Sequence, residues 1–286
     1  MTASLQQHIN PYLQLMRMDK PIGSLLLLWP TLWAVWIASA GDPDPVYVWV
    51  FTLGVFVMRS AGCVINDYAD RDFDPLVERT KQRPLAAGTL QAHHALLLFL
   101  VLGIMALCLL LLLPKNVWPW SIPAIIITVI YPFMKRLIEA PQLVLGVAFS
   151  FGIPMVFVTF DRAFDLSFWL LLICNFLWVL VYDTQYAMSD REDDLKIGVK
   201  STAILFGQND KLIILLLQIA VVLLWTSLIY VLNLDSSMWI ALVVSAILFL
   251  YQQWLIKDRD RAKCFQGFLN NGWFGAIIWF GLLVAF

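Results

Sequence analysis

Long apolar segments constrain the fold of this chain more than any other feature of its sequence. Windows of roughly 20 predominantly apolar residues recur along its whole length, and each is long enough to cross a bilayer as a helix. Hydrophobic residues make up 61% of the 286 residues, and charged residues only 14%. Because a soluble domain of this size does not need so much apolar surface, the sequence predicts an all-α, polytopic membrane protein.

Breaks that contain polar residues, Gly and Pro divide the chain into nine predicted transmembrane helices. Two longer polar loops are predicted at 67–92 and 189–210, and residues 1–20 are expected to form a short surface helix. We expect residues 1–286 to form a single integral-membrane domain. The predicted helices cover residues 22–40, 46–66, 93–113, 120–134, 141–160, 166–188, 211–232, 237–256 and 267–286.

Basic residues are distributed unevenly over the predicted loops. If the N-terminus is cytoplasmic, sixteen of the 19 Lys and Arg residues lie at the cytoplasmic side of the nine helices. Only Lys115 and Arg162 lie at the other side, and Arg59 lies within the second helix. This bias supports nine spans with the N-terminus in the cytoplasm. The distribution of basic residues does not resemble that of a nucleic-acid-binding surface, so a nucleic-acid partner is not expected.

A short acidic run follows the second predicted helix. If that helix continues past Ile65, then Asn66, Asp70 and Asp74 lie four residues apart and share one face. Carboxylates at this spacing repel one another unless a cation neutralises them. Carboxylate and amide oxygens are the ligands that hold Mg²⁺ together with substrate phosphates, which makes this run a candidate magnesium site. The alternative is a solvated, acidic helix end.

A second cluster of the same design lies at the end of the sixth predicted helix. Asp183, Asp190 and Asp194 follow one another there at spacings of seven and four residues. Both clusters end even-numbered helices and are followed by basic residues, which indicates a weak internal repeat between helices 1–4 and 5–8. Parallel repeats usually place the working site between their two halves. We therefore interpret the clusters as two sides of one site for a metal diphosphate.

Cationic residues near both clusters are candidate substrate ligands. Arg59 lies seven residues before Asn66 on the same helix face, and an arginine within a membrane helix marks a functional site by default. We expect it to hold a substrate anion; the alternative is an ion pair with a buried carboxylate such as Asp183. Loop cations such as Arg83 and Lys200 suit phosphate oxygens, although orientation of the chain in the bilayer would also explain them.

The parts found so far indicate one type of reaction. Tyr131, Lys135 and Arg136, at the end of the fourth predicted helix, could project into the same site. Magnesium would bind a diphosphate and neutralise it as a leaving group. The apolar bundle would accommodate a long hydrocarbon tail, and aromatic rings could stabilise an allylic cation. Together this chemistry is a magnesium-dependent prenyl transfer to an electron-rich acceptor.

The sequence resembles the UbiA-type membrane prenyltransferases, and within them those that act on 4-hydroxybenzoate in ubiquinone biosynthesis. Further similarity covers segments 17–23, 79–84, 131–136 and 197–202. The resemblance implies a nine-helix bundle in a bacterial inner membrane, with a central cavity open to the cytoplasm and, laterally, to lipid. The two family motifs stand here at Asn66-Asp67, Asp70 and Asp74, and at Asp190 and Asp194.

The resemblance also implies the reaction and the residues that perform it. A polyprenyl group would pass from a polyprenyl diphosphate to the ring carbon meta to the carboxylate of 4-hydroxybenzoate, with release of pyrophosphate. Asp190 and Arg136 are the expected catalytic residues: Asp190 would bind the metal or help to deprotonate the phenol, and Arg136 would bind the benzoate carboxylate. The expected ligands of Mg²⁺ are Asn66, Asp70, Asp74, Asp190 and Asp194. With the candidates above, the expected substrate-binding residues are Arg59, Arg71, Arg83, Tyr131, Lys135, Arg136 and Lys200.

Other functions fit parts of the same pattern. A UbiA-type enzyme that acts on a naphthoate, homogentisate or haem would share both motifs. A secondary transporter could have nine helices, a repeat and buried charge, but it would need neither paired aspartate clusters nor magnesium. A membrane phosphatidyltransferase depends on metal, but its acidic motif has a different spacing. The length of the prenyl chain depends on cavity depth, which no local motif determines.

Overall fold

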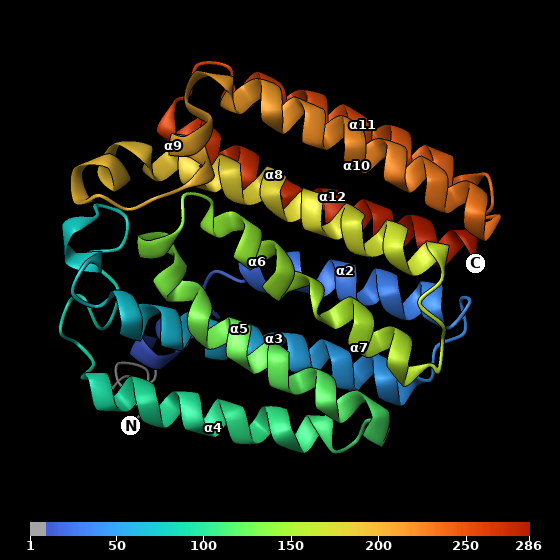
Figure 1. The fold of residues 1–286 in the computed structure, drawn as a ribbon, viewed down its shortest axis with the longest axis horizontal. Helices are drawn as coiled ribbons and strands as arrows, with labels where there is room; N and C mark the ends of the chain where they lie inside the picture. Colours follow the sequence, from blue (N-terminus) through green and yellow to red (C-terminus); the bar gives the residue numbers. More distant parts are fainter. Residues whose placement is uncertain (1–9) are drawn as a thin grey trace.

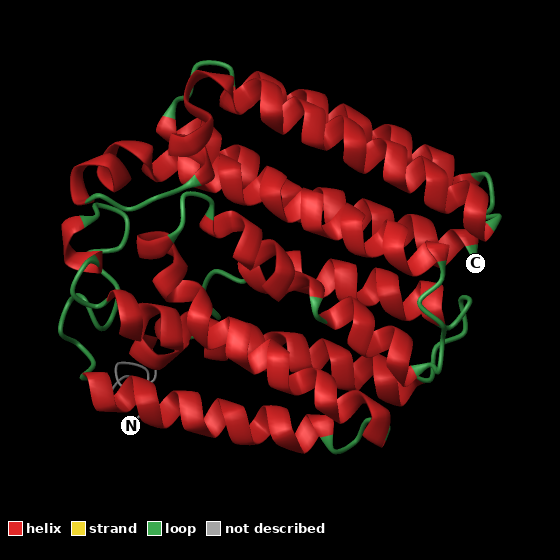
Figure 2. Cartoon of the chain, in the orientation of Figure 1, coloured by secondary structure: helices red, strands yellow, loops and turns green. Residues whose placement is uncertain are grey.

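The computed structural model describes residues 10–286, and within them it consists of helices joined by turns and loops, without strands (Figures 1 and 2). Residues 10–15 are helical, whereas the start of the predicted surface helix at 1–9 lies outside the described residues. The main helices are α2 (Ile22–Ala38), α3 (Pro45–Asp70), α4 (Ala92–Leu110), α5 (Trp118–Leu137), α6 (Pro141–Ser150), α7 (Gly152–Thr159), α8 (Leu166–Ile197), α9 (Thr202–Phe206), α10 (Asp210–Leu232), α11 (Ser237–Ile256) and α12 (Arg261–Ala285).

The nine predicted apolar segments all fold as helices. Eight of the described spans are long and apolar enough to cross a membrane, and α2 is a shorter apolar helix. The predicted helix at 141–160 is two helices, α6 and α7, that meet at Phe151. The predicted ends at residues 66 and 188 are too early, because α3 continues to Asp70 and α8 to Ile197. These added turns carry Asp70, Asp190 and Asp194, so the structure corrects the starts of the loops 67–92 and 189–210.

Helix ends are determined by side chains and glycine in the expected manner. Asp44 precedes α3 and accepts a hydrogen bond from the Val46 N–H at 2.8 Å, which satisfies a backbone donor that the helix leaves free. Asp165 does the same for α8, through the Phe168 N–H at 3.1 Å. The C-terminal end of α8 is Gly198, whose φ of 71° is a left-handed conformation that glycine adopts without strain.

The helices pack around a buried aromatic centre. Helix α8 contacts α6, α10 and α12, while α2 contacts α3, α7 and α12 (Figure 1). Trp33 of α2 meets Trp178 of α8 and Trp225 of α10, with ring centroids 5.2 Å apart in both pairs, and all three are fully buried. Large interlocking rings of this kind contribute more than their buried area alone. They join the two halves of the bundle.

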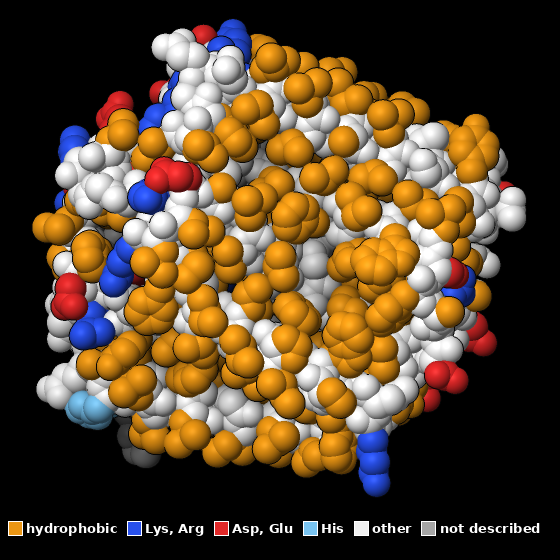
Figure 3. All heavy atoms as spheres, viewed as in Figure 1, with side chains coloured by type: hydrophobic (Ala, Val, Ile, Leu, Met, Phe, Trp, Pro, Cys, Tyr) orange, Lys and Arg blue, Asp and Glu red, His pale blue; other side chains and the backbone are white. Residues whose placement is uncertain are grey.

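The outer surface of the bundle is hydrophobic. On the face shown in Figure 3, hydrophobic side chains cover a wide band, and charged side chains gather at its two ends. The exposed residues include Leu97 and Leu100 of α4 and Leu250 of α11, each about 60% exposed or more. An apolar surface of this extent is unfavourable in water and is typical of contact with lipid. The surface therefore supports the polytopic membrane fold.

A buried amide network connects α8 to the last three helices. Gln252 of α11 accepts hydrogen bonds from Gln185 of α8 at 3.1 Å and from Gln218 of α10 at 2.9 Å. Asn271 of α12 donates to Gln185 at 2.9 Å and accepts one from Trp178 at 2.9 Å. In hydrocarbon, polar side chains on facing helices have few other partners. The network therefore fixes the rotation of α8, which carries the second acidic cluster.

The closest packing between α2 and α12 depends on a glycine, which gives a test of the fold. A Cβ atom at Gly275 would lie 2.1 Å from Cδ1 of Trp29, whereas one at Gly103 of α4 would meet no atom within 4 Å. We expect Gly275→Ala to destabilise the protein by about 1–3 kcal/mol through overpacking. Gly103→Ala should leave its thermal stability unchanged or higher. Melting temperatures of both variants in the same detergent check this, and equal values would contradict the packing.

Candidate active site

One large cavity opens into the bundle and connects polar and apolar regions. Its volume is about 1020 Å³, and residues of every helix from α2 to α8, of α12 and of the loops after α3 and α8 line it. Its apolar part reaches Leu113, Ser121 and Met155, which lie near the helix ends opposite the acidic clusters. A cavity of this size can hold a small organic molecule together with part of a long hydrocarbon chain.

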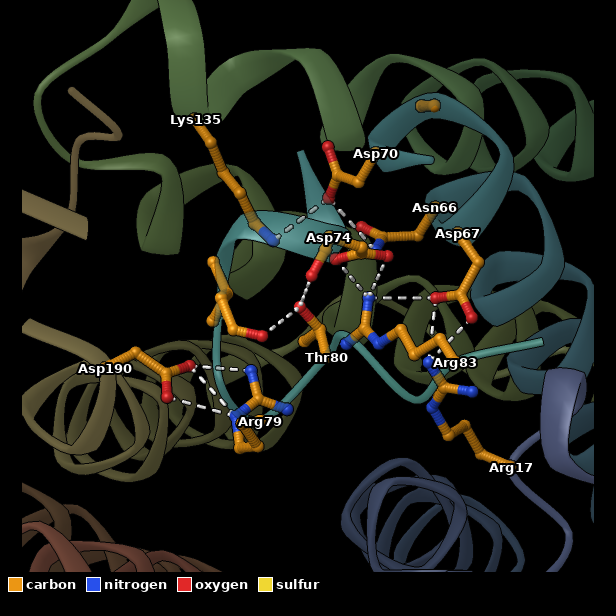
Figure 4. Close-up of polar contacts among 12 residues, drawn as sticks. Arg17, Asn66, Asp67, Asp70, Asp74, Arg79, Thr80, Arg83, Lys135 and Asp190 are labelled. Carbon is orange, nitrogen blue, oxygen red and sulfur yellow. Dashed lines mark hydrogen bonds and ion pairs between the residues drawn. The ribbon is translucent and has the colours of Figure 1, made fainter. Parts of the chain in front are cut away.

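The first acidic cluster lines this cavity, but not on one continuous helix. Helix α3 ends at Asp70, and Asp74 begins a 3₁₀ turn at Asp74–Leu76, so the expected shared helix face extends only from Asn66 to Asp70. The Asn66 side-chain amide donates to Asp70 at 3.3 Å. All three residues nevertheless line the cavity, because the turn directs Asp74 back toward the end of α3 (Figure 4).

The second cluster faces the first across the same cavity. Asp183, Asp190 and Asp194 all lie on α8 and all line the cavity, as their spacing predicts for one helix face. Asp190 is buried, and Asp194 is half-buried and forms no ion pair with any described residue. Two clusters that are more than 100 residues apart in the chain are therefore parts of one site.

Arginines of the loop after α3 bind carboxylates of both clusters (Figure 4). Arg79 donates to Asp190 through two nitrogens, at 2.6 Å from Nη2 and 3.0 Å from Nε, and its guanidinium lies 4.6 Å from the Tyr186 ring centroid. Arg83 bridges Asp74 at 2.9 Å and Asp67 at 3.0 Å. Forked pairs of this kind are strong and directional. They hold the loop over the charged end of the cavity.

The sequence did not single out all of these partners. Arg79 stood out only as one of several loop cations, and the pairing of Asp67 with Arg17 at 2.7 Å could not be predicted. The Asp67 carboxylate shares Arg83 with Asp74, so it is a structural neighbour of the site. The sequence signal for the pairs of Arg79 and Arg83 is the density of arginines after the first cluster, and it does not extend to Arg17.

Charges in this loop affect one another strongly. Burial raises the pKa of Asp74 above its ordinary value, and the adjacent Arg83 acts in the opposite direction. Burial alone would lower the pKa of Arg83, but Asp67 and Asp74 outweigh it, so the pKa of Arg83 is raised. Burial would also lower the pKa of Arg79, but Tyr186 and Asp190 outweigh it, so the pKa of Arg79 is raised as well. Both arginines therefore stay charged.

The end of α5 brings further cations to Asp70. Lys135 Nζ lies 3.6 Å from the Asp70 carboxylate, and Arg136 lies 3.1 Å from its other oxygen. Arg136 also donates to the Ala69 carbonyl at 2.8 Å and lies over the Phe73 ring, 4.2 Å from its centroid. Tyr131, one helical turn before Lys135, lines the cavity as well. The structure thus brings together the three residues that the sequence suggested at this helix end.

Two other predicted cations lie differently from the rest. Lys200 lines the cavity and pairs with Glu139 at 2.6 Å, which connects the loop after α8 to the end of α5. Arg71 is not among the residues that line the cavity: its guanidinium lies 4.7 Å from the Tyr68 ring centroid and 3.7 Å from Asp72. Because α3 ends at Asp70, the chain turns Arg71 away, and its role in binding a diphosphate stays a prediction.

Arg59 lines the deep part of the cavity and has no carboxylate partner among the described residues. It lies eleven residues before Asp70 on α3, about 16 Å along the helix at ~1.5 Å per residue. Its Nε is buried without a hydrogen-bond acceptor, and its guanidinium lies 5.7 Å from the Phe149 ring centroid. The expected alternative, an ion pair with Asp183, is not formed.

Comparison with known proteins decides the family. The sequence model of the UbiA prenyltransferase family matches residues 27–280. This chain belongs to the UbiA prenyltransferase family. It is 54% identical over 276 residues to a 4-hydroxybenzoate octaprenyltransferase of Tolumonas auensis, and 50% identical over 275 residues to one of Yersinia pseudotuberculosis. Each match covers 96% of both chains.

Solved structures with the UbiA fold are similar to this one over nearly its whole length. The apo structure of a UbiA homolog from Aeropyrum pernix covers 92% of this chain and 97% of its own, with a TM-score of 0.81 and 23% identity. A UbiA homolog from Archaeoglobus fulgidus bound to GPP and Mg²⁺ covers 96% of this chain and 99% of its own, with a TM-score of 0.72 and 18% identity. The helical bundle of the described residues therefore has the UbiA fold.

The donor atoms of the two clusters fit a hard divalent cation. Carboxylate oxygens of Asp70, Asp74, Asp190 and Asp194, with the amide oxygen of Asn66, are the ligand types that Mg²⁺ prefers. Within residues 10–286, no three acidic, His or Cys side chains yet converge on one point. Arg79, Arg83 and Lys135 hold three of the carboxylates instead. For both clusters to bind one metal ion, these carboxylates would have to release the cationic side chains that now bind them.

Carboxylates that line the cavity differ from carboxylates that are buried elsewhere in the scaffold, and this difference can be tested. Asp194 lines the cavity without an ion pair and lies four residues from Asp190, whereas Asp210 is fully buried outside the cavity between Arg191 and Arg259. We expect Asp194→Asn to reduce prenyl transfer roughly 100-fold, because it removes an expected metal ligand. Thermal stability should not fall, because the substitution relieves the repulsion between Asp194 and Asp190. Asp210→Asn should lower the melting temperature, because two arginines lose their counter-charge.

Activity and melting temperature of the purified variants check this prediction. The matched substitution makes the comparison direct, since each replaces one carboxylate by an amide of the same shape. An Asp194→Asn protein that melts earlier and keeps its activity would assign Asp194 to the scaffold.

Proposed function

We propose that this UbiA-family chain transfers a polyprenyl group from a polyprenyl diphosphate to the ring carbon meta to the carboxylate of 4-hydroxybenzoate, with release of pyrophosphate. The observation that carries the proposal is that aspartates of α3 and α8 face each other at the charged end of an otherwise apolar cavity. The substrates follow from the names of the bacterial relatives that are 50–54% identical. This reaction belongs to ubiquinone biosynthesis.

The charged end of the cavity suits the diphosphate. Mg²⁺, held by Asn66, Asp70, Asp74, Asp190 and Asp194, would neutralise the leaving diphosphate. Lys135 and Lys200 line the same region and can donate to phosphate oxygens. Arg79 and Arg83 now bind carboxylates, and both can turn to the diphosphate when metal takes their place. The hydrocarbon chain extends into the apolar depth toward Leu113.

Two arginines are candidates for the carboxylate of the acceptor. Arg136 already contacts Asp70 and the Ala69 carbonyl, whereas Arg59 forms no ion pair with any residue of 10–286 and lies deeper, beside Phe149. A buried, uncompensated cation gains more from a bound carboxylate than one that must first leave an ion pair. We therefore assign the carboxylate to Arg59. Arg136 then positions Asp70, and Asp190 can bind metal or take up the phenol proton of the acceptor.

The membrane orientation is part of the proposal. We place the chain in a bacterial inner membrane, surrounded by lipid, with its N-terminus and the charged end of the cavity on the cytoplasmic side. Support comes from the concentration of Lys and Arg in the loops at that end and from the apolar outer surface. The related functions that remain are those of UbiA-type enzymes with another aromatic acceptor.

A reconstituted assay tests the reaction. Purified protein in lipid nanodiscs is given octaprenyl diphosphate, radiolabelled 4-hydroxybenzoate and Mg²⁺, and the lipid-soluble label is measured. We expect product that disappears with EDTA and returns with excess Mg²⁺, because the leaving diphosphate needs neutralisation. The double variant Asp70→Asn, Asp194→Asn should form no product. Product formation in EDTA, or only with another aromatic acceptor, would contradict the proposal.

Single variants separate the two arginines. Arg59→Ala should raise the KM for 4-hydroxybenzoate about 10-fold or more, with little change for the donor, because a charge-assisted contact is lost. Arg136→Ala should instead raise the requirement for Mg²⁺ and donor, since Asp70 loses a partner. Steady-state kinetics with each substrate varied in turn provides the measurement. If only Arg136→Ala raises the KM for 4-hydroxybenzoate, the acceptor carboxylate binds Arg136.

A further inference from the structure

The side chain of Tyr182 on α8 ends in a hydroxyl group that has no partner. Tyr182 lines the cavity, is 1% exposed, and its hydroxyl makes no hydrogen bond to any described residue. A buried hydroxyl without a partner costs free energy, and a native structure tolerates few of them. A phenylalanine would fill the same space without that cost. Because Tyr182 lines the cavity, a molecule bound there can supply the partner that this hydroxyl lacks among the described residues.

The surrounding residues hold the Tyr182 ring firmly. Trp178 packs edge-on against it with ring centroids 5.2 Å apart, and Phe268 of α12 lies 6.2 Å away in a similar arrangement. Trp178 is itself fixed by its hydrogen bond to Asn271 in the amide network. A ring clamped in this way has lost its rotational freedom before any ligand arrives. Its hydroxyl is thus preorganised toward the cavity.

Tyr182 and Arg59 belong to the same part of the cavity. Phe149 of α6 contacts both: its ring centroid is 6.5 Å from that of Tyr182 and 5.7 Å from the Arg59 guanidinium carbon. Arg59 Nε and the Tyr182 hydroxyl are both buried polar atoms that have no hydrogen-bond partner in the described part of the chain. Two unpaired donors beside one aromatic ring form a pocket that matches an aromatic ring carrying an anionic group.

We propose that Tyr182 is a specificity residue that donates its hydroxyl hydrogen to the acceptor carboxylate held by Arg59. The inference rests on the proposed function and adds a recognition element to it. A carboxylate offers two oxygens, so Arg59 and Tyr182 can each bind one. The phenolic hydroxyl of Tyr182 is a donor in this contact, and no proton is transferred. The pocket therefore selects aromatic acids over neutral phenols of the same size.

The variant Tyr182→Phe removes only the hydroxyl and gives a direct test. Binding of 4-hydroxybenzoate to the full-length protein in nanodiscs is measured by calorimetry, beside steady-state kinetics and melting temperature. We expect acceptor affinity to fall and its KM to rise roughly 10-fold, because a hydrogen bond to a charged group is lost. The donor KM should not change. The melting temperature should stay equal or rise, because the hydroxyl forms no hydrogen bond with residues 10–286 that the substitution could remove.

A matched control and a second ligand complete the experiment. Tyr230→Phe on α10 alters an exposed tyrosine outside the cavity and should change none of these quantities. Phenol, which lacks the carboxylate, should bind wild-type and Tyr182→Phe protein equally. Unchanged acceptor affinity in Tyr182→Phe, or a lower melting temperature as its only effect, would overturn the inference. If wild-type protein prenylates a different acceptor and not 4-hydroxybenzoate, the proposed function fails instead.

Discussion

The neutralisation of aspartates inside a lipid-embedded cavity is the constraint on which the rest of this structure depends. Carboxylates in such a place are costly unless cations lie beside them. Arg83 serves Asp67 and Asp74, and Arg79 serves Asp190, so the loop between α3 and α4 is ordered by the charges it balances. A diphosphate with its metal ions brings the same balance of charge in a different arrangement. The site can therefore exchange partners without ever exposing bare carboxylates to hydrocarbon.

Such an exchange requires that the helices carrying the aspartates do not move with their partners. Outside the cavity, helix α8 is held in place by interactions that the reaction does not use. Asp210 binds Arg191 and Arg259, and Arg261 binds Asp193. Deeper in the membrane, Gln185 and Gln252 hold the same helix against α11. The α8 side chains in these contacts, Gln185, Arg191 and Asp193, do not line the cavity, so the scaffold and the site share a helix but not their side chains.

Local sequence predicts much of this architecture. The parts that it does not predict share one cause. Hydropathy predicts the nine spans, and helical spacing predicts that Asp190 and Asp194 share a face. The end of α3 at Asp70 was not predictable, so the 3₁₀ turn at Asp74 and the position of Arg71 outside the cavity lining were not predictable either. The partners of Arg79 and the pocket around Tyr182 arise from packing between distant segments, which periodicity does not encode. The internal repeat stays a prediction.

Arg59 differs in kind from every other cation of the site. The arginines at the charged end lie within reach of carboxylates, whereas Arg59 forms no ion pair with any described residue and lies beside the face of Phe149 and nearby tyrosine rings. Attraction to an aromatic face offsets part of the cost of burying a guanidinium, but less than a full counter-charge does. The remaining cost is relieved when an anion of suitable shape enters the pocket, and a neutral molecule cannot relieve it. An incompletely neutralised cation is thus a source of selectivity, and its position beyond the aspartates separates the anion of the acceptor from the diphosphate of the donor.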